Sequence, residues 1–100
     1  MYTPFMATLS KSPKINRMTN FMEELADSVL DELLSKNGAD FSASALTDIK
    51  ALALNRLWPM YTTTSAGKDY LKKVVEEDKI EKDVVRELRA AMDIVKSNPR

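Results

Sequence analysis

The chain of 100 residues contains no cysteine and no histidine. Without these residue types there is no disulfide, no thiolate nucleophile and no soft ligand set for zinc. The commonest general base is missing too, which leaves carboxylates, lysine, tyrosine and hydroxyl groups for any chemistry. We therefore expect no metal site, no resident cofactor and no enzymatic activity.

Net charge and long apolar runs are also missing. The 15 basic and 15 acidic side chains cancel, so the chain has no overall field that would attract DNA or an acidic membrane surface. No apolar run is long enough to cross a bilayer, and no segment has the pattern of a secretory leader. These absences predict a cytoplasmic protein without direct nucleic-acid or membrane partners.

The length fits one domain with a modest core, and a core of that size favours association between chains. Residues 1–15 contain two prolines and several hydroxyl residues without a regular apolar period, which predicts a flexible N-terminal arm. Residues 16–100 carry the helical patterns and form the expected domain.

The first expected helix begins after Asn20, whose side chain can accept from first-turn amides while Glu23 returns the bond in a capping box. Apolar residues then recur at helical spacing as far as Leu34. Gly38 ends the helix because glycine adopts the left-handed conformation that helix C-caps require.

A second helix is predicted over about 44–57, because Pro59 forces the preceding residue out of the helical region. A third is predicted over about 65–97, with hydroxyl residues before it as N-caps. Its apolar pattern is interrupted at residues 76–79, which indicates either a break near Asp78 or a long helix whose middle faces water. The charges of residues 72–83 are interpreted as a solvated helix face. The expected class is all-α, with three main helices including a long C-terminal one.

Residues 56–64 stand apart because they place a guanidinium, an indole, a phenol and three hydroxyls around the turn that Pro59 forces. Arginine holds phosphate oxygens or a guanine edge with two parallel bonds, and aromatic faces stack on bases. These groups suit a planar anionic ligand. The alternative is that Trp58 and Tyr61 are core or dimer anchors while Arg56 extends from a helix end.

The run ALALNRLWPMY at residues 51–61 follows Asp48 and precedes TSAG at residues 64–67. Together with NFMEE at residues 20–24, this run resembles the ComFB family of late competence development proteins, whose motifs occur in the same order. The resemblance covers roughly residues 16–70. The competence branch of the family carries clustered cysteines before the equivalent of Asp48, and residues 39–47 have none.

The chain thus looks more like the cysteine-free cyanobacterial branch, whose members are receptors for the second messenger cyclic di-GMP. The resemblance implies an all-helical homodimer that relays the signal by binding a downstream regulatory protein. Cyclic di-GMP is expected to bind through Arg56 and the turn that follows it, with Arg17 and Lys68 as further phosphate partners. The full set of predicted ligand-binding residues is Arg17, Arg56, Trp58, Tyr61, Thr62, Thr63 and Lys68. The alternative function is a helical protein interaction module that binds no small ligand.

Overall fold

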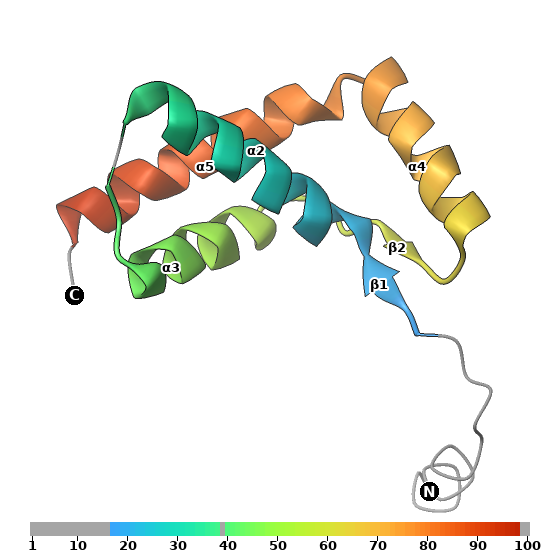
Figure 1. The fold of residues 1–100 in the computed structure, drawn as a ribbon, viewed down its shortest axis with the longest axis horizontal. Helices are drawn as coiled ribbons and strands as arrows, with labels where there is room; N and C mark the ends of the chain where they lie inside the picture. Colours follow the sequence, from blue (N-terminus) through green and yellow to red (C-terminus); the bar gives the residue numbers. More distant parts are fainter. Residues whose placement is uncertain (1–16, 39, 99–100) are drawn as a thin grey trace, which may run out of the picture.

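The computed structural model describes residues 17–38 and 40–98. The predicted arm at residues 1–15 lies outside the described residues. The elements in chain order are β1 (Thr19–Asn20), α2 (Phe21–Asn37), α3 (Ala43–Leu54), β2 (Tyr61–Thr62), α4 (Ser65–Glu77) and α5 (Ile80–Ser97) (Figure 1). The described part of the chain thus has four helices and one two-stranded antiparallel ribbon, and the all-α class is confirmed.

Helix α2 begins and ends where the sequence predicts. The Asn20 side chain accepts from the Met22 amide at 3.1 Å, and Gly38 has a left-handed φ of 62° while its amide donates to the Leu34 carbonyl. The return bond expected from Glu23 is not formed within residues 17–38 and 40–98. Asn20 Oδ1 instead accepts a second bond, 2.7 Å long, from the amide of Met60. The helix start is therefore fastened to the segment around Pro59.

Helix α3 ends at Leu54, three residues before the predicted end. The amide of Arg56 donates to the carbonyl of Ala53 at 3.0 Å, and that of Leu57 to the carbonyl of Leu54 at 3.3 Å. These hydrogen bonds join residues three apart, so they form a final turn that is tighter than an α-helical turn, as is common at helix ends. The chain is then free to run back as β2.

The predicted third helix is interrupted, so the sequence's count of three helices becomes four in the described residues. Helix α4 ends at Glu77, and Lys79 has a left-handed φ of 54° before α5 begins. Glycine usually occupies such a position, and here it is lysine. The break near Asp78, which the sequence left as one of two alternatives, is the one that forms.

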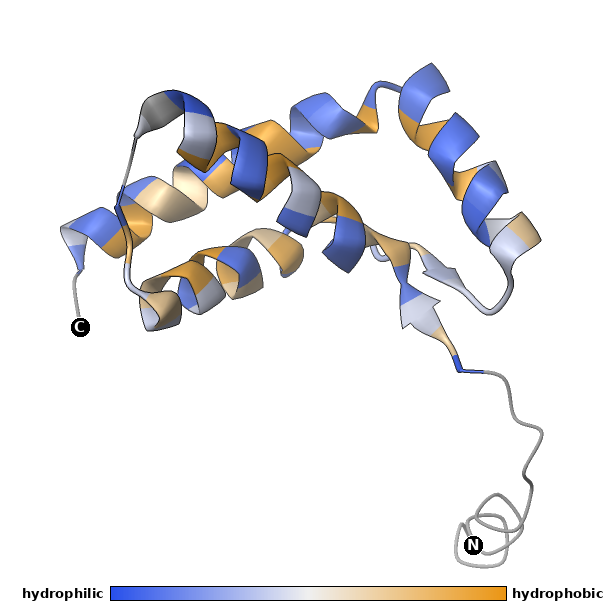
Figure 2. Ribbon diagram, viewed as in Figure 1, coloured by the Kyte–Doolittle hydropathy of each residue, from blue (hydrophilic) through white to orange (hydrophobic). Residues whose placement is uncertain are grey.

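The hydrophobic core lies between α2, α3 and α5, and the apolar faces of these helices turn towards one another (Figure 2). Ile49 of α3 and Val84 and Leu88 of α5 are its fully buried large side chains. Helix α4 lies to one side of this body and joins it through β2 and α5 (Figure 1). This arrangement of the helices leaves the ribbon and the first turns of α4 at the surface. None of the helices described is long and apolar enough to span a membrane.

Candidate functional site

The two short strands bring together segments that lie about forty residues apart in the chain. Thr19 pairs with Thr62, and Asn20 pairs with Tyr61, in antiparallel register. The Phe21 amide extends the ladder by donating to the Met60 carbonyl at 2.7 Å. This pairing places Arg17 beside the hydroxyl-rich run that precedes α4.

That run is ordered by its own hydrogen bonds. Thr64 is the N-cap of α4, and its Oγ1 accepts from the amide of Gly67 at 2.9 Å. Thr62 Oγ1 donates to the Thr64 carbonyl at 3.2 Å. A Cβ at Gly67 would lie inside the contact distance of Thr62 Oγ1. Glycine therefore allows the first turn of α4 to lie directly against the ribbon.

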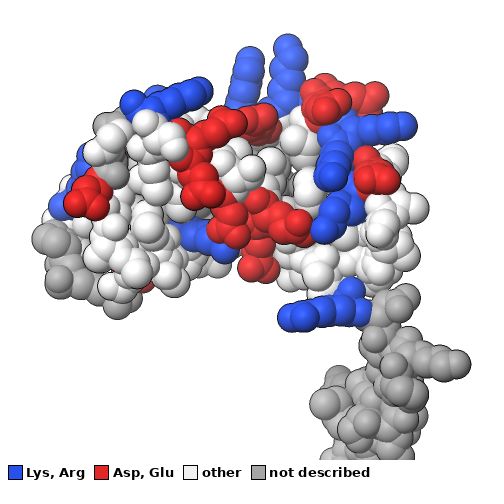
Figure 3. All heavy atoms as spheres, viewed as in Figure 1, with Lys and Arg blue, Asp and Glu red and all other residues white. Residues whose placement is uncertain are grey.

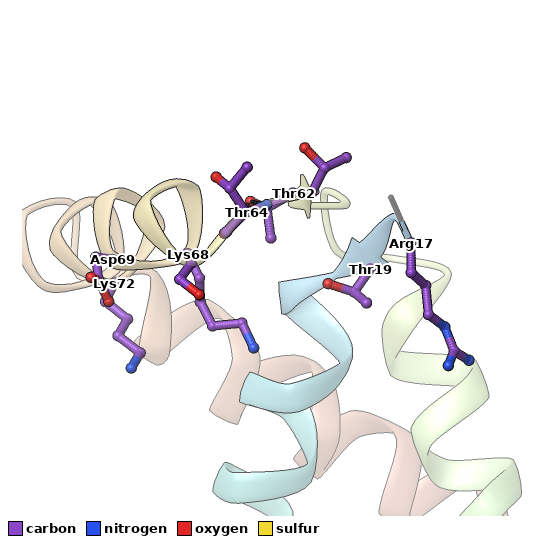
Figure 4. Close-up of a pocket in the computed structure, with 9 residues that line it drawn as sticks. Arg17, Thr19, Thr62, Thr64, Lys68, Asp69 and Lys72 are labelled. Atoms are coloured by element: carbon purple, nitrogen blue, oxygen red, sulfur yellow. Dashed lines mark hydrogen bonds between the residues drawn. The ribbon is translucent and has the colours of Figure 1, made fainter. Parts of the chain in front are cut away.

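A surface hollow of about 420 Å³ opens between the ribbon and the start of α4 (Figure 4). We call it the basic hollow, because three of its lining side chains are cations and one is an acid. It is lined by Arg17, Thr19, Thr62, Thr63, Thr64, Ser65, Lys68, Asp69 and Lys72. Its volume falls within the range of about 300–1,000 Å³ typical of small-molecule sites. Cations, hydroxyls and the N-terminus of a 13-residue helix together suit an anionic ligand.

Lys68 of this hollow is held by a partner on α2. Its Nζ lies 3.0 Å and 3.1 Å from the two carboxylate oxygens of Glu24. Both side chains are partly exposed, and an ion pair of this kind contributes only about 0–1 kcal/mol. The pair is therefore only a weak restraint on the position of the Lys68 ammonium group.

A second hollow of about 420 Å³ adjoins the first and has the opposite charge. We call it the acidic hollow. It is lined by Arg17, Met18, Thr19, Asn20, Glu23, Glu24, Asp27 and Tyr61. Arg17 and Thr19 line both hollows. On the surface, basic side chains over α4 lie beside a group of acidic side chains over α2 (Figure 3).

Most of the residues predicted from the sequence lie at these two hollows. Arg17, Thr62, Thr63 and Lys68 line the basic hollow, and Tyr61 lines the acidic one. Arg56 and Trp58 line neither hollow as the described residues form them. The geometry thus moves the candidate site from Arg56 to the side of the ribbon that carries Arg17.

The exposure of Trp58 and Tyr61 bears on whether they anchor the core, as one of the sequence-based interpretations holds. Trp58 is 86% exposed and Tyr61 is 58% exposed, so neither is a core anchor of the single chain. Tyr61 lines the acidic hollow, where a ligand or a second chain can contact it. For Trp58, which lies outside both hollows, a contact with another chain is the interpretation that its position favours.

Sequence reasoning missed Thr19, Ser65, Asp69 and Lys72 as lining residues, and it included Thr64 only through the hydroxyl run of residues 56–64. Thr19 enters only through a strand pairing too short to leave a periodic pattern. Lys72 was interpreted as part of a solvated face, although its spacing of four from Lys68 places both on one side of a helix. This spacing is the feature of the sequence that could have identified Lys72 as a lining residue.

Two comparisons with known proteins gave a match. The family model of the late competence development protein ComFB matches residues 19–99. The solved structure of the late competence protein ComFB from Bacillus subtilis superposes with a TM-score of 0.75 at 21% sequence identity, covering 84% of this chain and 93% of the other. At that identity the likeness shows a shared fold. No curated protein sequence matches the chain.

Proposed function

The chain belongs to the ComFB family, and from this premise we propose that it is a receptor for cyclic di-GMP that relays the level of this second messenger to a partner protein. The proposed receptor is cytoplasmic and homodimeric. It acts by binding alone, without catalysis and without a resident cofactor. Both the resemblance in its motifs and the two hollows at the ribbon support this proposal.

The basic hollow is the observation that carries the proposal. Cyclic di-GMP is a ring with two phosphodiester anions, and the basic hollow is lined by Arg17, which precedes β1, and by Lys68 and Lys72 of α4. Charge-assisted bonds from such cations contribute about 1.5–3 kcal/mol each. The threonine hydroxyls and the exposed amides at the start of α4 add neutral donors for phosphate oxygens.

Removing the lysines of the hollow tests this assignment. We expect Lys68→Ala and Lys72→Ala each to weaken cyclic di-GMP binding about tenfold or more, because each loses a charge-assisted bond. Lys73→Ala is the matched control, since Lys73 is an exposed lysine of α4 that does not line the basic hollow. Calorimetric titration measures all three. Equal affinity in the three variants and the unmodified chain would contradict the proposed site.

The exposure of Trp58 favours a second candidate function, a helical interaction module that binds other chains and no small ligand. This candidate predicts that Trp58→Ala abolishes association while leaving the fold intact, because an indole that is 86% exposed adds little to the core. Light scattering reports whether the particle has twice the mass of the chain. Capture of a partner protein only in the presence of added dinucleotide would count against this candidate.

A further inference from the structure

The acidic hollow beside the proposed phosphate site contains three carboxylates that differ in their partners. Asp27 forms an ion pair of 2.7 Å with Lys50, and Glu24 forms one of 3.0 Å with Lys68. Glu23 has no ion-pair or hydrogen-bond partner within residues 17–38 and 40–98, and its side chain is exposed. Glu23 is therefore the carboxylate of this hollow that is left to meet a ligand.

A free carboxylate selects its ligand by hydrogen bonding. An ionised carboxylate only accepts, and its two oxygens receive two parallel bonds. The Watson–Crick edge of guanine presents two adjacent donors, the ring N1–H and the exocyclic amino group. The same edge of adenine presents an acceptor at N1, which repels a carboxylate. A glutamate facing a base therefore favours guanine over adenine.

The other side chains that line the acidic hollow also suit a nucleobase. Tyr61 contributes an aromatic ring that is 58% exposed, and aromatic faces stack on nucleobases. Met18 adds an apolar side chain that is 62% exposed. No group of three acidic side chains in the described part of the chain is arranged to hold a metal ion.

The two hollows adjoin, because Arg17 and Thr19 line both of them. A cyclic dinucleotide carries each base on a ribose next to its phosphates. A phosphate bound in the basic hollow would therefore bring a base towards the acidic hollow, which Glu23 and Tyr61 line.

We propose that Glu23 is the specificity-determining residue of the site, which accepts from the N1–H and amino group of a guanine stacked on Tyr61 and so sets a preference for cyclic di-GMP over cyclic di-AMP. This inference rests on the proposed function. It adds which base the site selects and which side chain selects it.

The substitution Glu23→Gln tests the assignment. A glutamine keeps one acceptor and replaces the other with a donor, so it can no longer accept from both the N1–H and the amino group of guanine, whereas it can donate to N1 of adenine; its size is unchanged. We expect Glu23→Gln to bind cyclic di-GMP at least about tenfold more weakly than the unmodified chain and to bind cyclic di-AMP no more weakly. Glu32→Gln is the control, since Glu32 is an exposed glutamate of α2 that lines neither hollow.

Titration of the full chain and both variants with the two dinucleotides separates the outcomes, with circular dichroism to verify helix content. A preference for cyclic di-GMP that falls at least about tenfold in Glu23→Gln and is unchanged in Glu32→Gln supports the assignment. If the unmodified chain binds cyclic di-GMP and Glu23→Gln keeps the same preference, Glu23 is not the selecting residue and the receptor function stands. If the unmodified chain binds neither dinucleotide, the receptor function and this inference both fall.

Discussion

At the scale of single residues, the two glycines of the chain meet different structural requirements. Gly38 has a φ of 62° and open space around the position of a Cβ, whereas Gly67 lies against the side chains of Thr62 and Thr64. The requirement at Gly38 is one of backbone conformation. At Gly67 it is one of space, next to the basic hollow.

This difference predicts different consequences of the same substitution. Gly38→Ala should lower the free energy of unfolding by about 1 kcal/mol, since an L-residue in the left-handed region carries a cost of that size. It should leave cyclic di-GMP affinity unchanged, because Gly38 is at the far end of α2 from the ribbon. Chemical denaturation and calorimetric titration measure the two quantities.

Gly67→Ala should weaken ligand binding as well as stability. The added methyl group displaces Thr62, whose hydroxyl also bonds the Thr64 backbone, and so distorts one wall of the basic hollow. An affinity for cyclic di-GMP equal to that of Gly38→Ala would show that this wall does not contact the ligand.

At the scale of elements, Asn20 joins the start of α2 to the ribbon. Its Oδ1 accepts from Met22 and from Met60, at 3.1 Å and 2.7 Å. Asn20→Ala removes both bonds and should lower the free energy of unfolding by about 2 kcal/mol. Asn20→Asp should retain most of the stability, because its carboxylate accepts the same two bonds and suits a helix N-terminus. Thermal and urea unfolding compare the two; equal losses would mean that the bonds do not fasten the ribbon.

The elements also show how far the sequence determines the fold. Starts and stops that depend on a local cap were predicted correctly at Asn20 and Gly38. Thr64, the N-cap of α4, was one of several hydroxyl residues that the sequence offered for that role. The end of α3 was placed too late because Pro59 sets only a limit, and the chain leaves the helix earlier to reach β2. The break at Lys79 could not be decided, because a lysine in the left-handed conformation carries no sequence signal of the kind that glycine provides.

The candidate site was recovered less completely than the helices, for a physical reason. The local pattern at residues 56–64 indicated Thr62 and Thr63, whereas Arg17 and Lys68 were added as phosphate partners of the ligand that the resemblance implies. Thr19 reaches the same place only through pairing between two-residue strands, which are shorter than any pattern that periodicity detects. The sequence favoured Arg56 for the chemistry of its guanidinium group. In the fold, Arg56 lies in the turn after α3, before the chain reaches β2, and it lines neither hollow.

At the scale of the whole molecule, the three-helix body serves as a support for a site at its edge. The core of α2, α3 and α5 fixes β1, and α4 approaches the ribbon from the side (Figure 1). Contacts between α4 and α2 include the exposed pair of Lys68 and Glu24. This pair is a direct side-chain contact between the body and α4, at the edge of the basic hollow.

Binding of cyclic di-GMP at the ribbon is the proposal on which the ligand predictions above depend, and calorimetric titration of the folded 100-residue chain with cyclic di-GMP measures it. We expect saturable binding at micromolar concentrations, weakened by loss of Lys68 or Lys72 and not by loss of Lys73. Absence of any binding heat at those concentrations, with circular dichroism showing the protein to be folded, would contradict it.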